Sequence, residues 1–145
     1  MVSYKSGNHQ LVRGLAEIVS ATCLPQNSKT LLVPVPTSVQ KIKQRQIDTV
    51  GFLAKKIQTL NRNHTVANIL YLKREVSDQV GLSALARQQN LIGAIGCKSK
   101  LNGAVILLDD VITTGATISA AAKALKDAGA KSVTAIALCN AGKLH

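Results

Sequence analysis

Residues 105–117 read Val-Ile-Leu-Leu-Asp-Asp-Val-Ile-Thr-Thr-Gly-Ala-Thr, and this stretch decides the fold. Its first four residues, 105–108, predict a buried parallel strand, because a strand covered on both faces is continuously apolar. Asp109 and Asp110 follow at the carboxyl end of that strand, where open α/β sheets bind their ligands. A short loop with hydroxyl residues and one glycine then leads into an alanine-rich helix. The stretch therefore predicts a strand, an anion-binding loop and a helix in succession.

The loop after the two acids predicts a cradle of backbone N–H groups around an anion, at the N-terminus of the next helix. Paired acids beside such a cradle suit a ligand that carries both a phosphate and a diol. The alternative is that the carboxylates only cap the helix, which an Asp-Asp pair alone would favour. The full thirteen-residue pattern favours the ligand. The residues expected to hold the phosphate are Thr113, Thr114, Gly115, Ala116 and Thr117.

The same thirteen residues resemble the signature with which type I phosphoribosyltransferases bind phosphoribosyl pyrophosphate (PRPP). That signature has two acids, apolar residues and then Thr-Thr-Gly-x-Thr. The resemblance implies that Asp109 and Asp110 hold the ribose hydroxyls and act in catalysis. It also implies that Mg²⁺ lies nearby, reached by the acids indirectly through those hydroxyls or water, and that the loop binds the 5′-phosphate.

Length and composition indicate one domain over residues 1–145, large enough for an ordinary buried core. The apolar runs are too short for a membrane span, and the N-terminus lacks the apolar segment of a signal peptide. Cys23, Cys97 and Cys139 are far apart in the sequence, which predicts neither a disulfide framework nor a zinc site. We therefore expect a cytoplasmic protein that does not contact a membrane.

The chain is strongly basic, with 18 Lys+Arg against 7 Asp+Glu and a net charge of +11. This charge would attract polyphosphates or nucleic acid. An aromatic content of 2% argues against a stacking surface for single strands. The alternative is a solvated basic face that keeps the protein soluble.

Strands that alternate with helices predict an α/β fold: a doubly wound, largely parallel sheet with helices on both faces. Gly129 is expected to end the last helix. A cap at Thr37 or Ser38 is expected to begin a long helix that ends at about residue 60. The other helices are predicted over residues 9–21, 82–90 and 118–128, the strands over 30–35, 68–72, 105–108 and 132–139, and a loop or hairpin over 93–103.

A second informative stretch, Val-Pro-Val-Pro-Thr-Ser at residues 33–38, ends a strand with prolines and opens into a loop at a helix start. Pro36, Thr37 and Ser38 are candidates for the pyrophosphate side of a PRPP site, by the same helix-terminus argument. The alternative is a structural turn.

Lys73 and Arg74 lie between a strand and a polar segment. Cations on a closing loop would stabilise the charge of departing pyrophosphate and exclude water, so we take both as catalytic candidates. The alternative is an exposed run of charge.

A further segment indicates which group of these proteins the chain resembles. It consists of Gln-Val-Gly-Leu-Ser at residues 79–83, together with Arg87 and Asn90. With residues 33–36 and the PRPP motif, the chain is similar to the ComF (competence protein F) family of phosphoribosyltransferase-like proteins. Residues 4–7 resemble the family's sequence before its first helix. This chain differs from the family in two ways. It lacks the cysteine-rich zinc ribbon of longer members. Where the family has Arg-Gly-Phe-Asn-Gln, residues 45–49 of this chain are Arg-Gln-Ile-Asp-Thr. The resemblance implies a link to DNA uptake, but it does not identify the molecule that would accept the phosphoribosyl group.

Two functional hypotheses follow. The first is a Mg²⁺-dependent phosphoribosyltransferase that moves the phosphoribosyl group of PRPP to an unidentified nitrogen nucleophile and releases pyrophosphate. The second is a non-catalytic protein that binds PRPP, a ribose phosphate or a nucleotide, or serves DNA uptake, with a basic face for DNA or a competence protein. A homodimer is compatible with both. The candidate DNA-binding residues are Lys41, Lys43, Arg45, Lys55 and Lys56.

Overall fold

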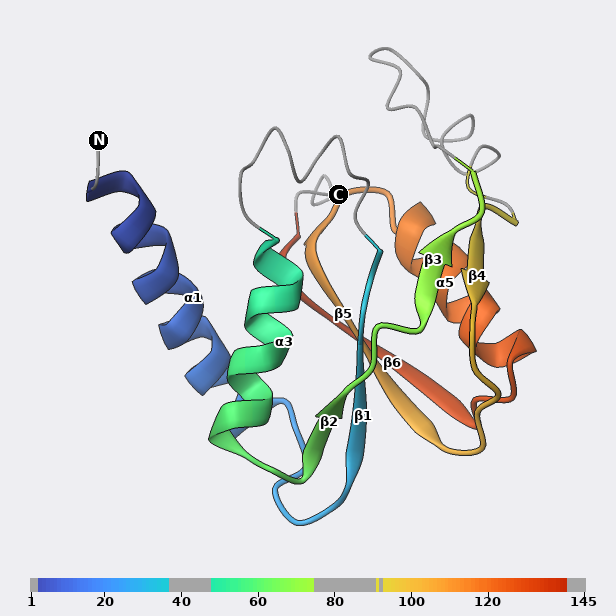
Figure 1. The fold of residues 1–145 in the computed structure, drawn as a ribbon, viewed down its shortest axis with the longest axis horizontal. Helices are drawn as coiled ribbons and strands as arrows, with labels where there is room; N and C mark the ends of the chain where they lie inside the picture. The colour runs from blue at the N-terminus through green and yellow to red at the C-terminus, as the bar shows by residue number, and fades with distance from the viewer. Residues whose placement is uncertain (1–2, 37–47, 75–90, 92, 141–145) are drawn as a thin grey trace.

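The computed structural model describes residues 3–36, 48–74, 91 and 93–140. A four-stranded parallel sheet in the order β2-β1-β5-β6 lies between helices on its two faces (Figure 1). The predicted fold class is thus confirmed. The described elements are α1 (Ser3–Thr22), β1 (Thr30–Pro34), α3 (Thr49–Leu60), β2 (His64–Val66), β3 (Leu70–Leu72), β4 (Ile95–Cys97), β5 (Ala104–Ile112), α5 (Ala116–Asp127) and β6 (Ser132–Asn140).

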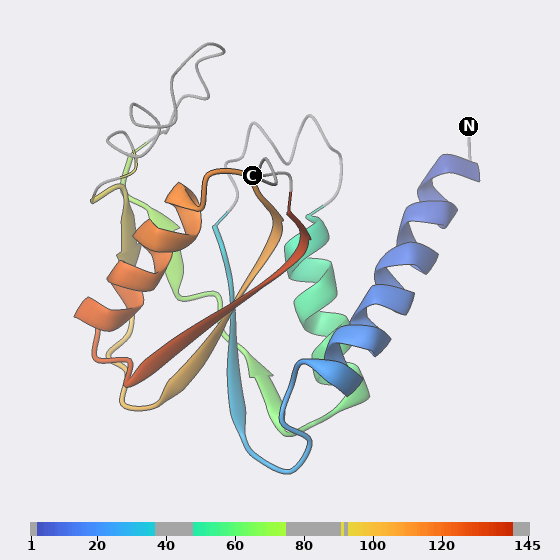
Figure 2. The same ribbon diagram turned by 180° about the vertical axis from the view of Figure 1, so that it is seen from behind.

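The two faces of the sheet carry separate hydrophobic clusters, because side chains alternate along each strand. Ile106 and Leu108 of β5 pack with α1 and α3, whereas Val105 and Leu107 pack with α5. Figure 2 shows these helices on opposite sides of the sheet. Leu107 and Leu108 are fully buried, and full burial of a leucine side chain contributes about 1.5–3 kcal/mol. The central strand β5 therefore contributes side chains to both clusters.

The predicted strand at residues 68–72 forms, as β3, but it does not belong to the parallel sheet. It pairs antiparallel with β4, with Leu70 opposite Cys97 and Leu72 opposite Ile95. The inward side chains of this pair join the cluster on the α5 face. The stretch 93–103, predicted as loop or hairpin, supplies β4. Three-residue strands carry too little periodicity to reveal their partner from the sequence.

The long helix predicted from residue 37 or 38 to about residue 60 is wrong at its start. The described helix α3 begins at Thr49, and the Asp48 carboxylate caps it by accepting a hydrogen bond from the Gly51 N–H at 3.0 Å. The buried residues of this helix are Val50, Leu53, Ala54 and Ile57. Thr37 and Ser38 lie outside the described residues, as does the predicted helix 82–90. Asn61 ends α3 as predicted.

Other boundaries differ by a few residues, and one short strand was missed. Helix α1 begins earlier than predicted, and β5 runs four residues further than predicted, to Ile112. The strand β2 was not predicted. Gly129 ends α5 as predicted, with φ at 104° and with the Ala130 N–H donating to the Leu125 carbonyl at 3.0 Å. Across the described residues, no helix is both long and apolar enough to cross a membrane.

His64, the first residue of β2, is fully buried at the end of the sheet where β1 begins. Within the described part of the chain, neither of its ring nitrogens has a hydrogen-bond partner. Burial lowers the pKa of this imidazole below its ordinary value of 6.5, because a charged ring would be desolvated. Burial therefore favours the neutral form of His64 in the folded state.

We expect His64→Leu to weaken the acid sensitivity of folding. Between the lowered pKa and about 6.5 the unfolded chain binds a proton that the folded chain does not, so stability falls as pH falls. The loss is at most about 1.4 kcal/mol per pH unit for one proton. Denaturant unfolding at pH 7.5 and pH 5 should show a smaller difference in His64→Leu than in the wild type or in His9→Leu. Equal differences in all three would contradict the argument.

Candidate functional site

Several elements end or begin at one edge of the sheet. β1, β5 and β6 run parallel, so their carboxyl ends meet there, and Figure 1 shows α3 and α5 beginning at the same end. Beyond β1 the Val35 N–H still donates to the Leu108 carbonyl, at 2.8 Å. The β1–β5 pairing ends with Pro34 opposite Leu108, and Pro36 follows two residues after the end of β1. One predicted pyrophosphate residue therefore follows the carboxyl end of the strand next to β5.

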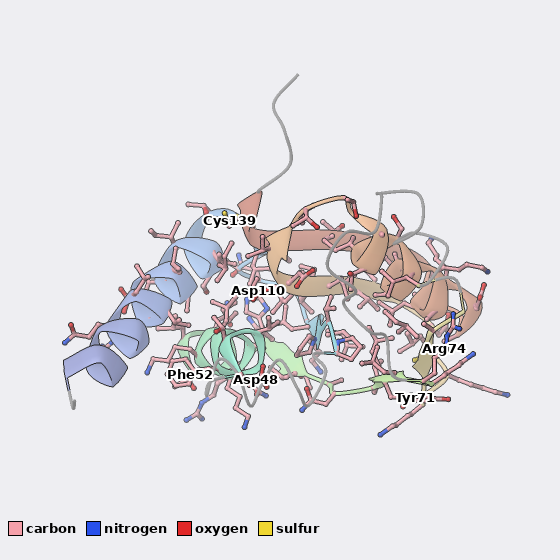
Figure 3. All side chains as sticks on the ribbon, turned by 90° about the horizontal axis from the view of Figure 1, so that it is seen from above. Asp48, Phe52, Tyr71, Arg74, Asp110 and Cys139 are labelled. Atoms are coloured by element: carbon pink, nitrogen blue, oxygen red, sulfur yellow. The ribbon has the colours of Figure 1, made fainter. Side chains whose placement is uncertain are left out.

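The two acids lie on β5 itself, not after its end. Alternation along the strand directs them to opposite faces: Asp109 to the α5 face, and Asp110 to the face of α1 and α3, where Figure 3 shows it. Asp109 is only 8% exposed, whereas Asp110 is half-buried. The Asp109 Oδ1 accepts from the Asp110 N–H, and the Asp110 Oδ1 accepts from the Val111 N–H, both at 2.8 Å. The adjacent carboxylates therefore have different surroundings.

The loop between β5 and α5 has the predicted strand–loop–helix geometry. Gly115 is the N-cap of α5 in the left-handed conformation, with φ 73° and ψ 0°. Its carbonyl accepts the Ser119 N–H at 2.9 Å, and the Thr114 Oγ1 accepts the Ala116 N–H at 3.4 Å. Thr113 and Thr114 are exposed, and the space where a Gly115 side chain would lie is open. The first amides of α5 thus face an accessible loop.

The two helix N-termini at this edge differ in their caps. At α3 the Asp48 carboxylate occupies the cap, with its oxygens against Gly51. At α5 the cap residue is a glycine, which brings no negative charge of its own. A helix N-terminus attracts anions through its amides and its dipole, and a carboxylate already there repels them. Of these two helices, α5 is therefore the one suited to bind a phosphate.

The two predicted cations do not lie with the acids. Lys73 and Arg74 are exposed residues that directly follow β3, and the Lys73 N–H donates to the Ala94 carbonyl at 2.8 Å. Figure 3 shows Arg74 beside the β3–β4 pair, apart from Asp110. The structure places the acids and the phosphate loop in succession on β5 and at the start of α5, and Pro36 just beyond the end of the adjacent strand β1. It leaves Lys73 and Arg74 on a separate element.

Two residues at the same edge were not predicted as part of the site. Asp48 caps α3, and Cys139 is an exposed residue paired with Val111 near the end of β6. The signal for Asp48 was an acid directly before a regular apolar face. The signal for Cys139 was its place at the end of the last parallel strand, because all such ends share one edge.

The acids fit a magnesium ion that is held mainly by a substrate. Among the described residues, no group of three or more His, Cys, Asp or Glu side chains could form a metal cage. Mg²⁺ keeps several waters and is usually bound through one or two carboxylates together with substrate phosphates. Asp110 is the accessible carboxylate of the two and suits that role, whereas Asp109 is nearly buried and lies on the opposite face of β5.

We expect Gly115→Ala to destabilise the protein through its backbone alone, because φ is 73° and nothing lies within 4 Å of the added Cβ. The cost of this conformation for an alanine is about 1–2 kcal/mol. Gly93→Ala is a matched control, with φ 69° and equally open space away from the loop. Denaturant unfolding should show similar losses for both variants. A neutral effect of Gly115→Ala would contradict the loop geometry.

Comparison with known proteins agrees with this architecture. The sequence profile of the phosphoribosyl transferase domain matches residues 8–144. Among solved structures, a hypoxanthine phosphoribosyltransferase from Staphylococcus aureus has a similar fold, with a TM-score of 0.53 and 11% sequence identity. The alignment covers 97% of this chain and 70% of that one. A comparison with curated protein sequences gives no match.

Proposed function

The chain belongs to the phosphoribosyl transferase domain family, and from this premise we propose that it binds PRPP with Mg²⁺ and transfers the phosphoribosyl group to a nitrogen nucleophile. Pyrophosphate leaves in the same reaction. One observation carries the proposal: the glycine-capped N-terminus of α5 directly follows the strand that bears Asp109 and Asp110. A phosphate site and a diol site thus lie one short loop apart.

The 5′-phosphate binds to the backbone of residues 113–117. Support comes from the exposed threonines, the open space at Gly115 and the absence of a carboxylate cap on α5. Asp110, the more accessible acid, accepts hydrogen bonds from the ribose hydroxyls, whereas the buried Asp109, on the other face of β5, adds negative charge from a greater distance. The pyrophosphate lies toward Pro36, Thr37 and Ser38, and the support is that Pro36 follows the carboxyl end of β1, the strand paired with β5.

In the reaction, the bond between C1 of ribose and the pyrophosphate oxygen breaks, and a bond from the acceptor nitrogen to C1 forms. Positive charge develops on the sugar ring, and the carboxylates of Asp109 and Asp110 oppose it. Mg²⁺, when bound, neutralises charge on the departing pyrophosphate. Lys73 and Arg74 supply further positive charge there if the end of β3 moves toward the acids.

Within the family we assign the chain to the ComF group, as a single domain over residues 1–145. The support is in the sequence: Val-Pro-Val-Pro at 33–36 and the segment from Gln79 to Asn90. Residues 79–90 lie outside the described structure. Asp48 caps α3 at one of the positions where the chain departs from the group's pattern. Asn, which the group has at that position, caps helices about as well as Asp, so this departure keeps the cap and adds a negative charge to it.

We expect Asp110→Asn to weaken PRPP binding about 10–150-fold, because losing a charged hydrogen-bonding partner costs about 1.5–3 kcal/mol. Asp127→Asn is the matched control, since that carboxylate makes only an exposed ion pair with Lys123 at 2.9 Å. Calorimetric titration with PRPP and Mg²⁺ measures both. The proposal fails if the folded wild type gives no heat at millimolar PRPP, or if Asp110→Asn binds as well as the control.

The second candidate function is contact with nucleic acid through a basic face. The observation that favours it is the pair Lys55 and Lys56 on α3, exposed and half-buried respectively, in a chain of net charge +11. Lys41, Lys43 and Arg45 lie outside the described residues. Such contact would be weak and independent of base sequence, because phosphate contacts alone produce it.

If this second function exists, affinity for a labelled DNA duplex should fall steeply between about 50 and 200 mM salt. Lys55→Ala should weaken binding and flatten the salt dependence, since each lost phosphate contact lowers the slope by about one. Lys131→Ala, which removes an exposed lysine between α5 and β6, is the control. Fluorescence anisotropy measures both. If the affinity for single- and double-stranded DNA does not change with salt, the basic residues form only a solvated surface and the second function is rejected.

A further inference from the structure

The loop that leads into β5 contains the step Asn102–Gly103. In such a step the backbone nitrogen of the glycine attacks the side-chain carbonyl carbon of the asparagine, and the lack of a Cβ on glycine leaves the approach open. Each of the other asparagines in the chain precedes a residue that has a side chain. Asn102 is therefore the asparagine whose sequence most favours this reaction.

The structure leaves both reacting groups accessible. The Asn102 side chain is exposed, and in the described part of the chain neither its amide nor the Gly103 N–H has a hydrogen-bond partner. A Cβ on Gly103 would meet no atom within 4 Å apart from its chain neighbours, so the space around this residue is open. The reaction therefore has no hydrogen bond of either reacting group to break.

Positive charge lies close to the same loop. Lys100 is exposed and precedes Asn102 by two residues. The Lys131 N–H donates to the Gly103 carbonyl at 2.8 Å, and the Lys126 ammonium donates to the Lys131 carbonyl at 2.7 Å. The attack needs the Gly103 nitrogen to lose its proton, and nearby positive charge stabilises the anion that results. The basic surroundings therefore favour the reaction.

We propose that Asn102 is a site of spontaneous modification, at which asparagine is converted to isoaspartate and aspartate. The Gly103 nitrogen forms a bond to the Asn102 side-chain carbonyl carbon, and the bond from that carbon to the amide nitrogen breaks. The proton lost by the Gly103 nitrogen leaves with that amide nitrogen as ammonia. Water then opens the five-membered ring at either of its two carbonyl carbons. One opening gives aspartate, and the other gives isoaspartate, whose backbone runs through the former side chain.

Isoaspartate at this position disturbs the entry to β5. The Leu101 N–H donates to the Ala128 carbonyl at 2.8 Å on one side of Asn102, and the Gly103 carbonyl is held on the other side by the hydrogen bond given above. The Leu101 carbonyl also packs so closely on the α5–β6 turn that a Cβ on Gly129 would clash with it. Isoaspartate inserts one backbone carbon between these two attachments, so at least one of them has to change. This inference uses no residue of the candidate site and does not rest on the proposed function.

The first test measures the conversion in the whole, folded chain. After incubation in mildly alkaline buffer, peptide mass analysis detects the replacement of an –NH2 group by –OH at each asparagine. We expect conversion at Asn102 to be several-fold faster than at Asn27, which is also exposed but precedes Ser28. Gly103→Ala should slow conversion at Asn102 several-fold, because the added methyl group hinders the attack. Alanine fits the open space there, and circular dichroism checks that the variant folds.

The second test measures what isoaspartate does to the fold. A methyltransferase specific for isoaspartate labels the modified chains, and denaturant unfolding compares incubated with fresh protein. We expect the labelled fraction to unfold at a lower denaturant concentration than fresh protein. Asn102→Asp, which brings the charge without the extra backbone carbon, should unfold close to the fresh wild type.

The proposed site is overturned if Asn102 is not converted, if Asn27 is converted as fast, or if folded Gly103→Ala is converted as fast as the wild type. The proposed effect on the entry to β5 is overturned if chains with isoaspartate at position 102 unfold like fresh protein, or if Asn102→Asp is destabilised as much as they are.

Discussion

The parallel pairing of β5 with β1 and β6 is the constraint on which the rest of the structure depends. It brings three carboxyl ends to one edge and leaves β5 buried on both faces, between the α1–α3 cluster and the α5 cluster. Buried backbone groups must be paired, so the strand has little freedom to shift. A one-residue slip would exchange the faces of Asp109 and Asp110 and would put Leu107 and Leu108 into each other's cluster. Site geometry and core packing are thus fixed by the same hydrogen bonds.

The loop after β5 makes the N-terminus of α5 suited to an anion. A left-handed Gly115 lets the chain leave the strand and start α5 at once, without a side chain on the helix cap. The neighbouring helix α3 begins with a carboxylate at Asp48. The same sheet edge therefore carries one helix start that is already occupied by negative charge and one that is suited to a phosphate.

The sequence predicted the parts whose signals are local. A continuously apolar strand, two acids and a glycine-containing loop at 105–117 predicted β5, the loop and α5. The separation of the acids onto opposite faces was not predictable, because it depends on how far β5 continues beyond Leu108, and partner strands decide that. Lys73 and Arg74 follow a strand as predicted, but the antiparallel partner of that strand was not predictable, since β3 is too short to reveal it. Both features depend on which strands pair with each other, and the periodicity of the sequence does not show that.

The central claim is that the N-terminus of α5 binds the phosphate of a ribose phosphate. Backbone amide NMR with ribose 5-phosphate tests it residue by residue. We predict the largest shifts at Thr114, Gly115 and Thr117, with smaller changes at Asp110 and little at Gly51 on the carboxylate-capped α3. Unchanged amides at the loop in the presence of millimolar ribose 5-phosphate, or the largest shifts at Gly51, would contradict the account.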